Sequence, residues 1–150
     1  MRALMTVDAV EVTGCAANTS PSELSARLIG SYFNTGPMTP GSRLNDILAM
    51  VRLRQQSGDV PGALRVEGLL VRCTSADCGS SDVLGSIVDL GMTTVGSSHL
   101  LRMDWDMANK RFRFRRDSDP FAYATYTVSD ALPPVLAFKS LQTRTLLANC

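Results

Sequence analysis

LLRMDWDMANKRFRFRRD, from Leu100 to Asp117, holds two runs of alternating apolar and polar residues around a short polar turn. Successive side chains of a β-strand point to opposite faces, so each run is typical of a strand with one buried face. The pattern predicts an antiparallel hairpin that turns at Ala108-Asn109-Lys110 and places Trp105, Phe112 and Phe114 in the core. The polar positions on the solvent face are Arg102, Asp104, Asp106, Arg111, Arg113 and Arg115.

An isolated hairpin is marginal in water, so other segments must supply sheets that cover its apolar face. Turn formers recur along the whole chain at spacings typical of a β-sandwich or barrel. We therefore predict an all-β fold, an antiparallel β-sandwich or barrel over residues 1–150 as a single domain, with about nine or ten strands and room for one short helix. Besides the hairpin, the predicted strands are Met5–Thr13, Leu24–Asn34, Leu44–Gln56, Ala63–Cys73, Val83–Leu90, Phe121–Val128 and Leu136–Ala148.

Leu44–Gln56 fits two periodicities. A period of two residues turns Ile47, Ala49, Val51 and Leu53 inward and Arg52 and Arg54 outward, whereas a helical period produces the apolar stripe Leu44, Ile47, Leu48 and Val51. We favour a strand because the neighbouring segments are all β-like. Gly30 and Gly68 lie inside predicted strands and indicate β-bulges.

Composition narrows the class of protein. The chain has 150 residues, 45% of them hydrophobic, and a formal net charge of +1. A general nucleic-acid binder would carry a strong basic excess, so we expect no nucleic-acid partner. No run approaches the roughly 20 apolar residues of a membrane-spanning helix. Lys110 and Lys139 are the only lysines among 15 basic residues, and this excess of arginine is explained either by genome base composition or by recognition of anions.

The four cysteines, Cys15, Cys73, Cys78 and Cys150, predict two disulfides. Cys73 and Cys78 flank a short polar loop, and Cys15 and Cys150 lie near termini that are often close together in space. Zinc would need further ligands, and His99 is the only histidine; reduced, buried thiols are the other alternative. Two disulfides predict a secreted, periplasmic or cell-surface protein. Residues 1–15 do not read as a signal peptide, so an exported chain would be a mature form or an excised domain.

The hairpin is similar to a recurring feature of the concanavalin A-like and laminin-G-like jelly rolls, in which a leucine-x-hydrophobic-x-tryptophan-aspartate strand, a short turn and an aromatic-x-aromatic strand follow one another. The corresponding residues are Leu101, Met103, Trp105, Asp106, Asn109, Lys110, Phe112 and Phe114. That superfamily contains lectins, adhesion modules, polysaccharide hydrolases and lyases. The resemblance implies an extracytoplasmic, glycan-associated or adhesive role, because a jelly roll does not dictate one activity.

Evidence for catalysis is weak. Glycoside hydrolysis needs two carboxylates across a cleft, and Asp104 and Asp106 are better explained as partners of arginines across the hairpin. A lyase would need a base such as His99 beside a tyrosine and an arginine, and nothing in the sequence brings these together. We expect no catalytic residue, no metal and no cofactor. A calcium site would have to draw on Asp104, Asp106, Asn109, Asp117 and Asp119, which converge only if both ends of the hairpin meet.

The arginine-rich face is the most useful indication of function. Guanidinium groups on one sheet face form charge-assisted bidentate hydrogen bonds with carboxylates and sulfates. We predict a non-catalytic binding or adhesion module for a glycan or anionic polymer. The alternatives are an ordinary solvated face, a small polysaccharide-active enzyme, and a structural subunit that forms homo-oligomers through sheet edges. The candidate ligand-binding residues are Arg102, Arg111, Arg113, Arg115, Arg52 and Arg54.

Overall fold

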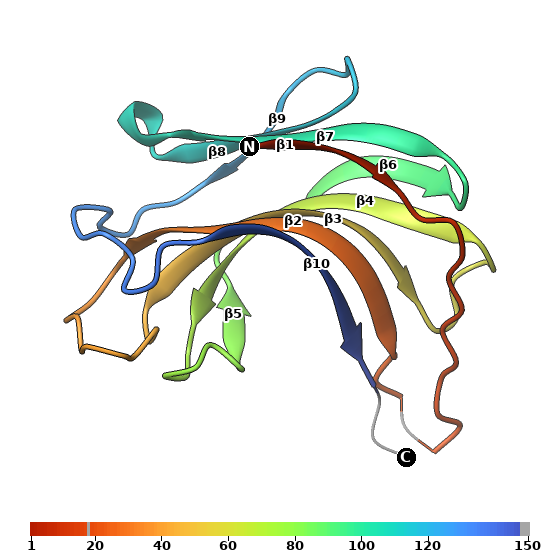
Figure 1. Ribbon diagram of the computed structural model, residues 1–150, viewed down its shortest axis with the longest axis horizontal. Coiled ribbons are helices and arrows are strands. Elements are labelled where there is room, and N and C mark those ends of the chain that lie inside the picture. Colours follow the sequence, from red (N-terminus) through yellow and green to blue (C-terminus); the bar gives the residue numbers. More distant parts are fainter. Residues whose placement is uncertain (18, 148–150) are drawn as a thin grey trace.

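The computed structural model describes residues 1–17 and 19–147, and two antiparallel sheets stack face to face in it as a β-sandwich (Figure 1). This confirms the predicted fold class. The only helical segment among the described residues is one short 3-10 turn. The elements are β1 (Arg2–Thr6), β2 (Glu23–Asn34), β3 (Asp46–Gln56), β4 (Ala63–Cys73), β5 (Ser81–Val83), β6 (Val88–Thr94), β7 (Ser98–Asp106), η1 (Met107–Asn109), β8 (Arg111–Arg116), β9 (Ala122–Thr125) and β10 (Lys139–Leu146).

The two sheets differ in size. The smaller sheet has the strand order β1-β7-β8-β9, and the larger sheet has the order β10-β2-β3-β4-β5, with β6 also paired to β4. The long strands of the larger sheet bend away from the smaller sheet, so its outer face is concave (Figure 1).

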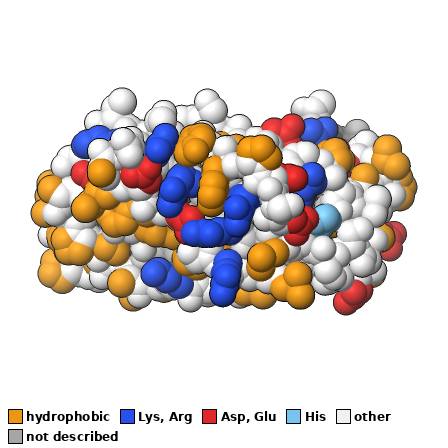
Figure 2. Space-filling model, turned by 90° about the horizontal axis from the view of Figure 1, so that it is seen from above, with side chains coloured by type: hydrophobic (Ala, Val, Ile, Leu, Met, Phe, Trp, Pro, Cys, Tyr) orange, Lys and Arg blue, Asp and Glu red, His pale blue; other side chains and the backbone are white. Residues whose placement is uncertain are grey.

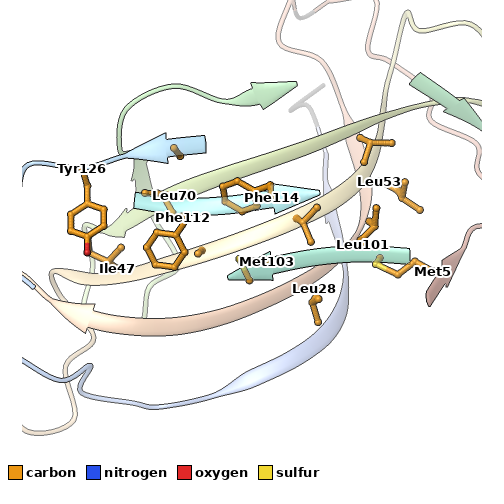
Figure 3. Close-up of a cluster of buried hydrophobic side chains, with 14 of the residues drawn as sticks. Met5, Leu28, Ile47, Leu53, Leu70, Leu101, Met103, Phe112, Phe114 and Tyr126 are labelled. Carbon is orange, nitrogen blue, oxygen red and sulfur yellow. The ribbon is translucent and has the colours of Figure 1, made fainter. Parts of the chain in front are cut away.

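The predicted hairpin is formed by β7 and β8. Met103 lies opposite Phe114 and Trp105 lies opposite Phe112, and both phenylalanines are 0% exposed. Figure 3 shows Met103, Phe112 and Phe114 in one cluster with Leu70 of β4 and Leu53 of β3, which come from the other sheet. The hairpin therefore supplies one half of the core between the sheets.

The ambiguous segment after Leu44 is a strand, β3. Its inward side chains are Ile47, Ala49, Val51 and Leu53, as the two-residue period predicts. The intervening Leu48 and Met50 are buried as well, in a second apolar cluster on the outer face of the larger sheet. Because both faces of β3 are apolar here, its sequence also fits a helical period. The second cluster comprises Ile29, Leu48, Met50, Leu69, Val71 and Cys73, with Cys78 and Phe138 packed against it.

Several predicted strands have the wrong bounds. The first strand, β1, ends at Thr6, which pairs with Ser98, the first residue of β7. Residues 7–13 have no strand beside them with which to pair. The prediction Val83–Leu90 spans the end of β5 and the start of β6, which are separated by a turn in which Gly85 has a φ of 78°. The closing strand ends at Leu146, and its predicted end, Ala148, lies outside the described residues.

One predicted disulfide is present. Cys73, at the end of β4, is bonded to Cys78, and the bridge closes the polar loop between them. This bond covers part of the second apolar cluster. The predicted Cys15–Cys150 pair involves Cys150, which lies outside the described residues.

Candidate functional site

Four of the six candidate arginines lie on the outer face of the smaller sheet. Arg102 comes from β7, and Arg111, Arg113 and Arg115 come from β8. The register places Arg102 opposite Arg115, so basic side chains of the two strands are direct neighbours. Figure 2 shows lysine and arginine side chains gathered around hydrophobic side chains in the middle of one face of the molecule.

A phenyl ring organises three of these arginines. The guanidinium carbons of Arg102, Arg113 and Arg115 lie 5.5, 5.2 and 4.7 Å from the centre of the Phe121 ring. Cation–π attraction of this kind orients guanidinium groups without neutralising their charge. We call Arg102, Arg113, Arg115 and Phe121 the arginine cluster. Phe121 lies just before β9, and sequence reasoning missed it because its contact with the arginines is formed only once β9 pairs with β8.

The cluster carries an excess of positive charge. Asp104 Oδ2 lies 2.8 Å from Arg102 Nε and 3.7 Å from Arg113 Nη2. Arg115 has no ion pair within residues 1–17 and 19–147, and its buried Nε has no hydrogen-bond partner there. One carboxylate therefore pairs with two of the three guanidinium groups, and Arg102 and Arg113 keep 39% and 36% of their side-chain surface exposed.

Arg111 has a partner of its own. Its Nε lies 2.8 Å from Asp106 Oδ2 and its guanidinium carbon lies 4.5 Å from the centre of the Tyr123 ring. The hydrogen bonds from Arg111 and Asn109 lower the pKa of the Asp106 carboxyl. Asp106 therefore neutralises Arg111, whereas the arginine cluster keeps its excess of positive charge.

A pocket of about 550 Å³ borders the cluster. Arg102, Asp104 and Arg113 form its border with the cluster, and Tyr32, Trp105 and Lys139 add two aromatic side chains and a further cation. Burial, followed by the nearby Asp104 charge, raises the pKa of Tyr32 to about 12, so its hydroxyl stays protonated at neutral pH. Both aromatic side chains are already engaged within the protein: the Tyr32 hydroxyl donates to Met1 Sδ, Trp105 Nε1 donates to the Tyr126 hydroxyl, and the Trp105 ring stacks on Phe33 and Phe112. The pocket therefore extends the basic surface mainly through Lys139.

Arg52 and Arg54 do not join the cluster. They lie on β3 in the larger sheet, and their side chains are only 11% and 10% exposed, so the expected solvent-facing position is wrong. Arg52 lies 2.8 Å from Glu23 and 2.9 Å from Glu67, and Arg54 lies 2.7 Å from Glu67. Glu67 is directly opposite Arg52 in the register. Opposite charges at outward positions of adjacent strands were the sequence signal for this network.

His99 has partners that the sequence did not reveal. Its Nδ1 lies 2.7 Å from Asp117 Oδ2, and its Nε2 lies 2.6 Å from Thr93 Oγ1. Asp117 Oδ1 also accepts a hydrogen bond from the backbone N–H of Leu100. The hydrogen bond from His99 is the main cause that lowers the pKa of Asp117. These contacts join β6, β7 and the turn after β8.

The aspartates of the calcium alternative contact other side chains. Asp104 and Asp106 contact arginines, Asp117 contacts His99, and Asp119 contacts Arg116. Among the described residues, no three His, Cys, Asp or Glu side chains are grouped so as to hold a metal ion. The same part of the chain contains no helix long and apolar enough to cross a membrane.

No protein-family model, curated protein or solved structure matches this chain. Its function is therefore inferred from the geometry of the arginine cluster and its surroundings.

Proposed function

We propose that this protein is a non-catalytic binding module that holds an anionic polymer, a glycan bearing carboxylate or sulfate groups, on the arginine cluster. The observation that carries the proposal is the placement of three guanidinium groups around Phe121, of which two pair with the Asp104 carboxylate and the third has no ion pair among the described residues. Guanidinium groups form short, bidentate, charge-assisted hydrogen bonds with carboxylate and sulfate oxygens. Preorganisation by the ring reduces the side-chain entropy lost on binding.

The surroundings of the cluster favour an extended ligand over a small ion. The cluster lies on an exposed sheet face, and the adjacent pocket adds Lys139. A further cation suits a second acidic group along a chain. A polymer that crosses both regions would contact the arginine cluster with one acidic group and Lys139 with another.

The Cys73–Cys78 disulfide supports an extracytoplasmic location, where such bonds persist. The resemblance of the hairpin to the concanavalin A-like and laminin-G-like jelly rolls supports the same proposal. The ion pairs of Asp104 and Asp106 with arginines support a binding role over hydrolysis, which needs two carboxyl groups that face each other across a cleft.

Binding to immobilised polyanions tests the proposal. Polygalacturonate and heparin serve as carboxylated and sulfated probes, and neutral dextran as the uncharged one. We expect binding of at least one polyanion that weakens as salt rises, because exposed charges are screened. The double variant R113Q/R115Q should bind at least about tenfold more weakly, which corresponds to about 1.4 kcal/mol.

Arg65→Gln is the matched control, because Arg65 is exposed on the larger sheet and its loss makes the same kind of charge change far from the cluster. R65Q should bind as the wild-type protein does. Equal affinity of R113Q/R115Q and wild type, or equal binding of dextran and the polyanions, would contradict the proposal.

A further inference from the structure

A second candidate site lies on the opposite side of the molecule, on the concave outer face of the larger sheet. It is a groove of about 240 Å³. Its floor is the second apolar cluster, and Phe138 and the Cys78–Gly79 segment form its walls. The floor residues Ile29, Leu48, Met50 and Val71 are 2 to 6% exposed. An apolar, concave surface of this kind suits a small apolar group.

The remaining lining is basic. Arg27 comes from β2, Arg43 from the loop before β3, and Arg144 from β10. No acidic side chain is among the described residues that line the groove. Arg43 has Asp46 at 4.0 Å, whereas Arg27 and Arg144 have no ion pair within the described part of the chain.

The donors of two of these arginines are incompletely used. Arg27 Nη2 donates to Gln142 Oε1 at 3.0 Å, but the buried Nε of Arg27 has no hydrogen-bond partner among the described residues. The same holds for the buried Nε and Nη2 of Arg43. Buried donors without acceptors are costly, so an anion that accepted from them would be bound with a net gain.

Electrostatics at the groove agree with this geometry. Burial, followed by repulsion from Arg144 and Arg52, lowers the pKa of the Arg27 guanidinium. On the same sheet face, Arg52 and Arg54 are neutralised by Glu23 and Glu67. Arg27 and Arg144, by contrast, have no ion pair among the described residues.

We propose that this groove binds a small acidic amphiphile, in which a carboxylate or sulfate group is attached to a short unbranched apolar tail. The tail lies on Ile29, Leu48, Met50 and Val71, and the acidic group lies between Arg27 and Arg144, which belong to adjacent strands. The small volume of the groove limits the tail to a short chain. The site is independent of the arginine cluster, which lies on the other sheet.

Octanoate and octyl sulfate are the probes for the two acidic groups, with octanol as the uncharged tail and acetate as the tailless acid. We expect one or both amphiphiles to shift the methyl NMR signals of Ile29, Leu48, Met50 and Val71, while the exposed Leu4 and Met107 serve as reference signals elsewhere. Octanol and acetate should bind at least about tenfold more weakly, because each lacks one half of the recognised chemistry.

Arg27→Gln and Arg144→Gln should each weaken amphiphile binding about tenfold, as expected when one charge-assisted hydrogen bond is lost. Arg144 is on an edge strand and only partly buried, so R144Q keeps the test valid if R27Q fails to fold. R65Q, on the same face outside the groove, and R113Q, in the other site, should bind as wild type does. Octanol binding as tightly as octanoate, unchanged affinity in R144Q, or shifts away from the floor methyls would overturn the proposal.

Discussion

Gly68, in the middle of β4, makes room for the Phe114 ring of the opposing sheet. A Cβ atom at position 68 would lie 2.7 Å from the Cδ1 and Cδ2 atoms of Phe114, closer than real Cβ contacts. Phe114 is fully buried, so the ring has little space into which it can move. The absence of a side chain at Gly68 therefore decides how closely the hairpin can approach the larger sheet.

Gly68→Ala should lower the free energy of unfolding by about 1–3 kcal/mol, the usual cost of overpacking a core. Chemical denaturation measures this change. The double variant G68A/F114L is the control: the smaller, flexible side chain relieves the clash, so the double variant should be less destabilised than the two single changes predict together. Strict additivity would show that the ring and the glycine do not interact.

Gly68 and Gly30 lie inside strands, and the sequence predicts a β-bulge at each of them. The registers instead shift between Arg65 and Glu67 in the β4–β6 pair, and between Ser31 and Phe33 in the β2–β3 pair. The sequence shows that Gly68 has no side chain. The Phe114 ring that fills the space comes from a strand more than forty residues away, so no local pattern predicts the contact.

At the level of elements, the contacts of Asp117 hold the start of β7 against the end of β8. Asp117 accepts hydrogen bonds from the His99 ring and from the Leu100 backbone. It has a φ of 50°, a left-handed conformation that aspartate and asparagine tolerate better than most residues. Asparagine is therefore a conservative replacement that removes the charge but keeps the backbone conformation.

Asp117→Asn should lower the melting temperature at pH 7 by a few degrees at most, since the aspartate is 43% exposed and exposed pairs contribute less than about 1 kcal/mol. The folded state lowers the pKa of Asp117. Its stabilisation is thus complete above the carboxyl pKa of the unfolded chain, about 3.9, and is lost as the pH falls through the lower folded-state pKa. The gap between wild type and D117N should stay constant from pH 7 to about pH 5 and narrow as the pH falls below about 3.9. A gap that stays constant with pH would assign the effect to packing.

At the scale of the whole molecule, the two candidate sites lie on opposite outer faces of the sandwich. The arginine cluster rests on β7, β8 and the segment before β9, and the groove rests on β2, β3, β4 and β10. The Cys73–Cys78 bond belongs to the groove side, since Cys78 lines the groove and packs on the second apolar cluster. Changes to this bond should therefore affect one face and leave the other unchanged.

The double variant C73A/C78A should lose about 2 kcal/mol of stability, the chain-entropy value for a short closed loop. Denaturant titration measures the loss, and far-UV circular dichroism should still show a β-sheet protein. Octanoate affinity should fall because the wall of the groove is released, while affinity for the polyanions should match wild type. Parallel loss of both affinities would mean that the variant is globally perturbed and that the two faces are not independent.

Local patterns in the sequence predict most of the strands and the apolar face of the β7–β8 hairpin. The alternation around Met103, Trp105, Phe112 and Phe114 specifies the hairpin because side-chain direction in a strand is a property of neighbouring residues. The Cys73–Cys78 bond was predictable for the same reason, since few residues separate its partners.

Only the tertiary structure decided which sheet each strand joins and what each outward charge meets. The two-residue period predicts that Arg54 and Arg113 both point away from the core. Strand order then places Arg54 beside Glu67 and Arg113 beside Phe121. Strand order is set by pairing and packing between segments distant in sequence, which leave no local pattern. The arginines of the groove come from β2, β10 and a loop, so for the same reason no local pattern predicts that they lie together.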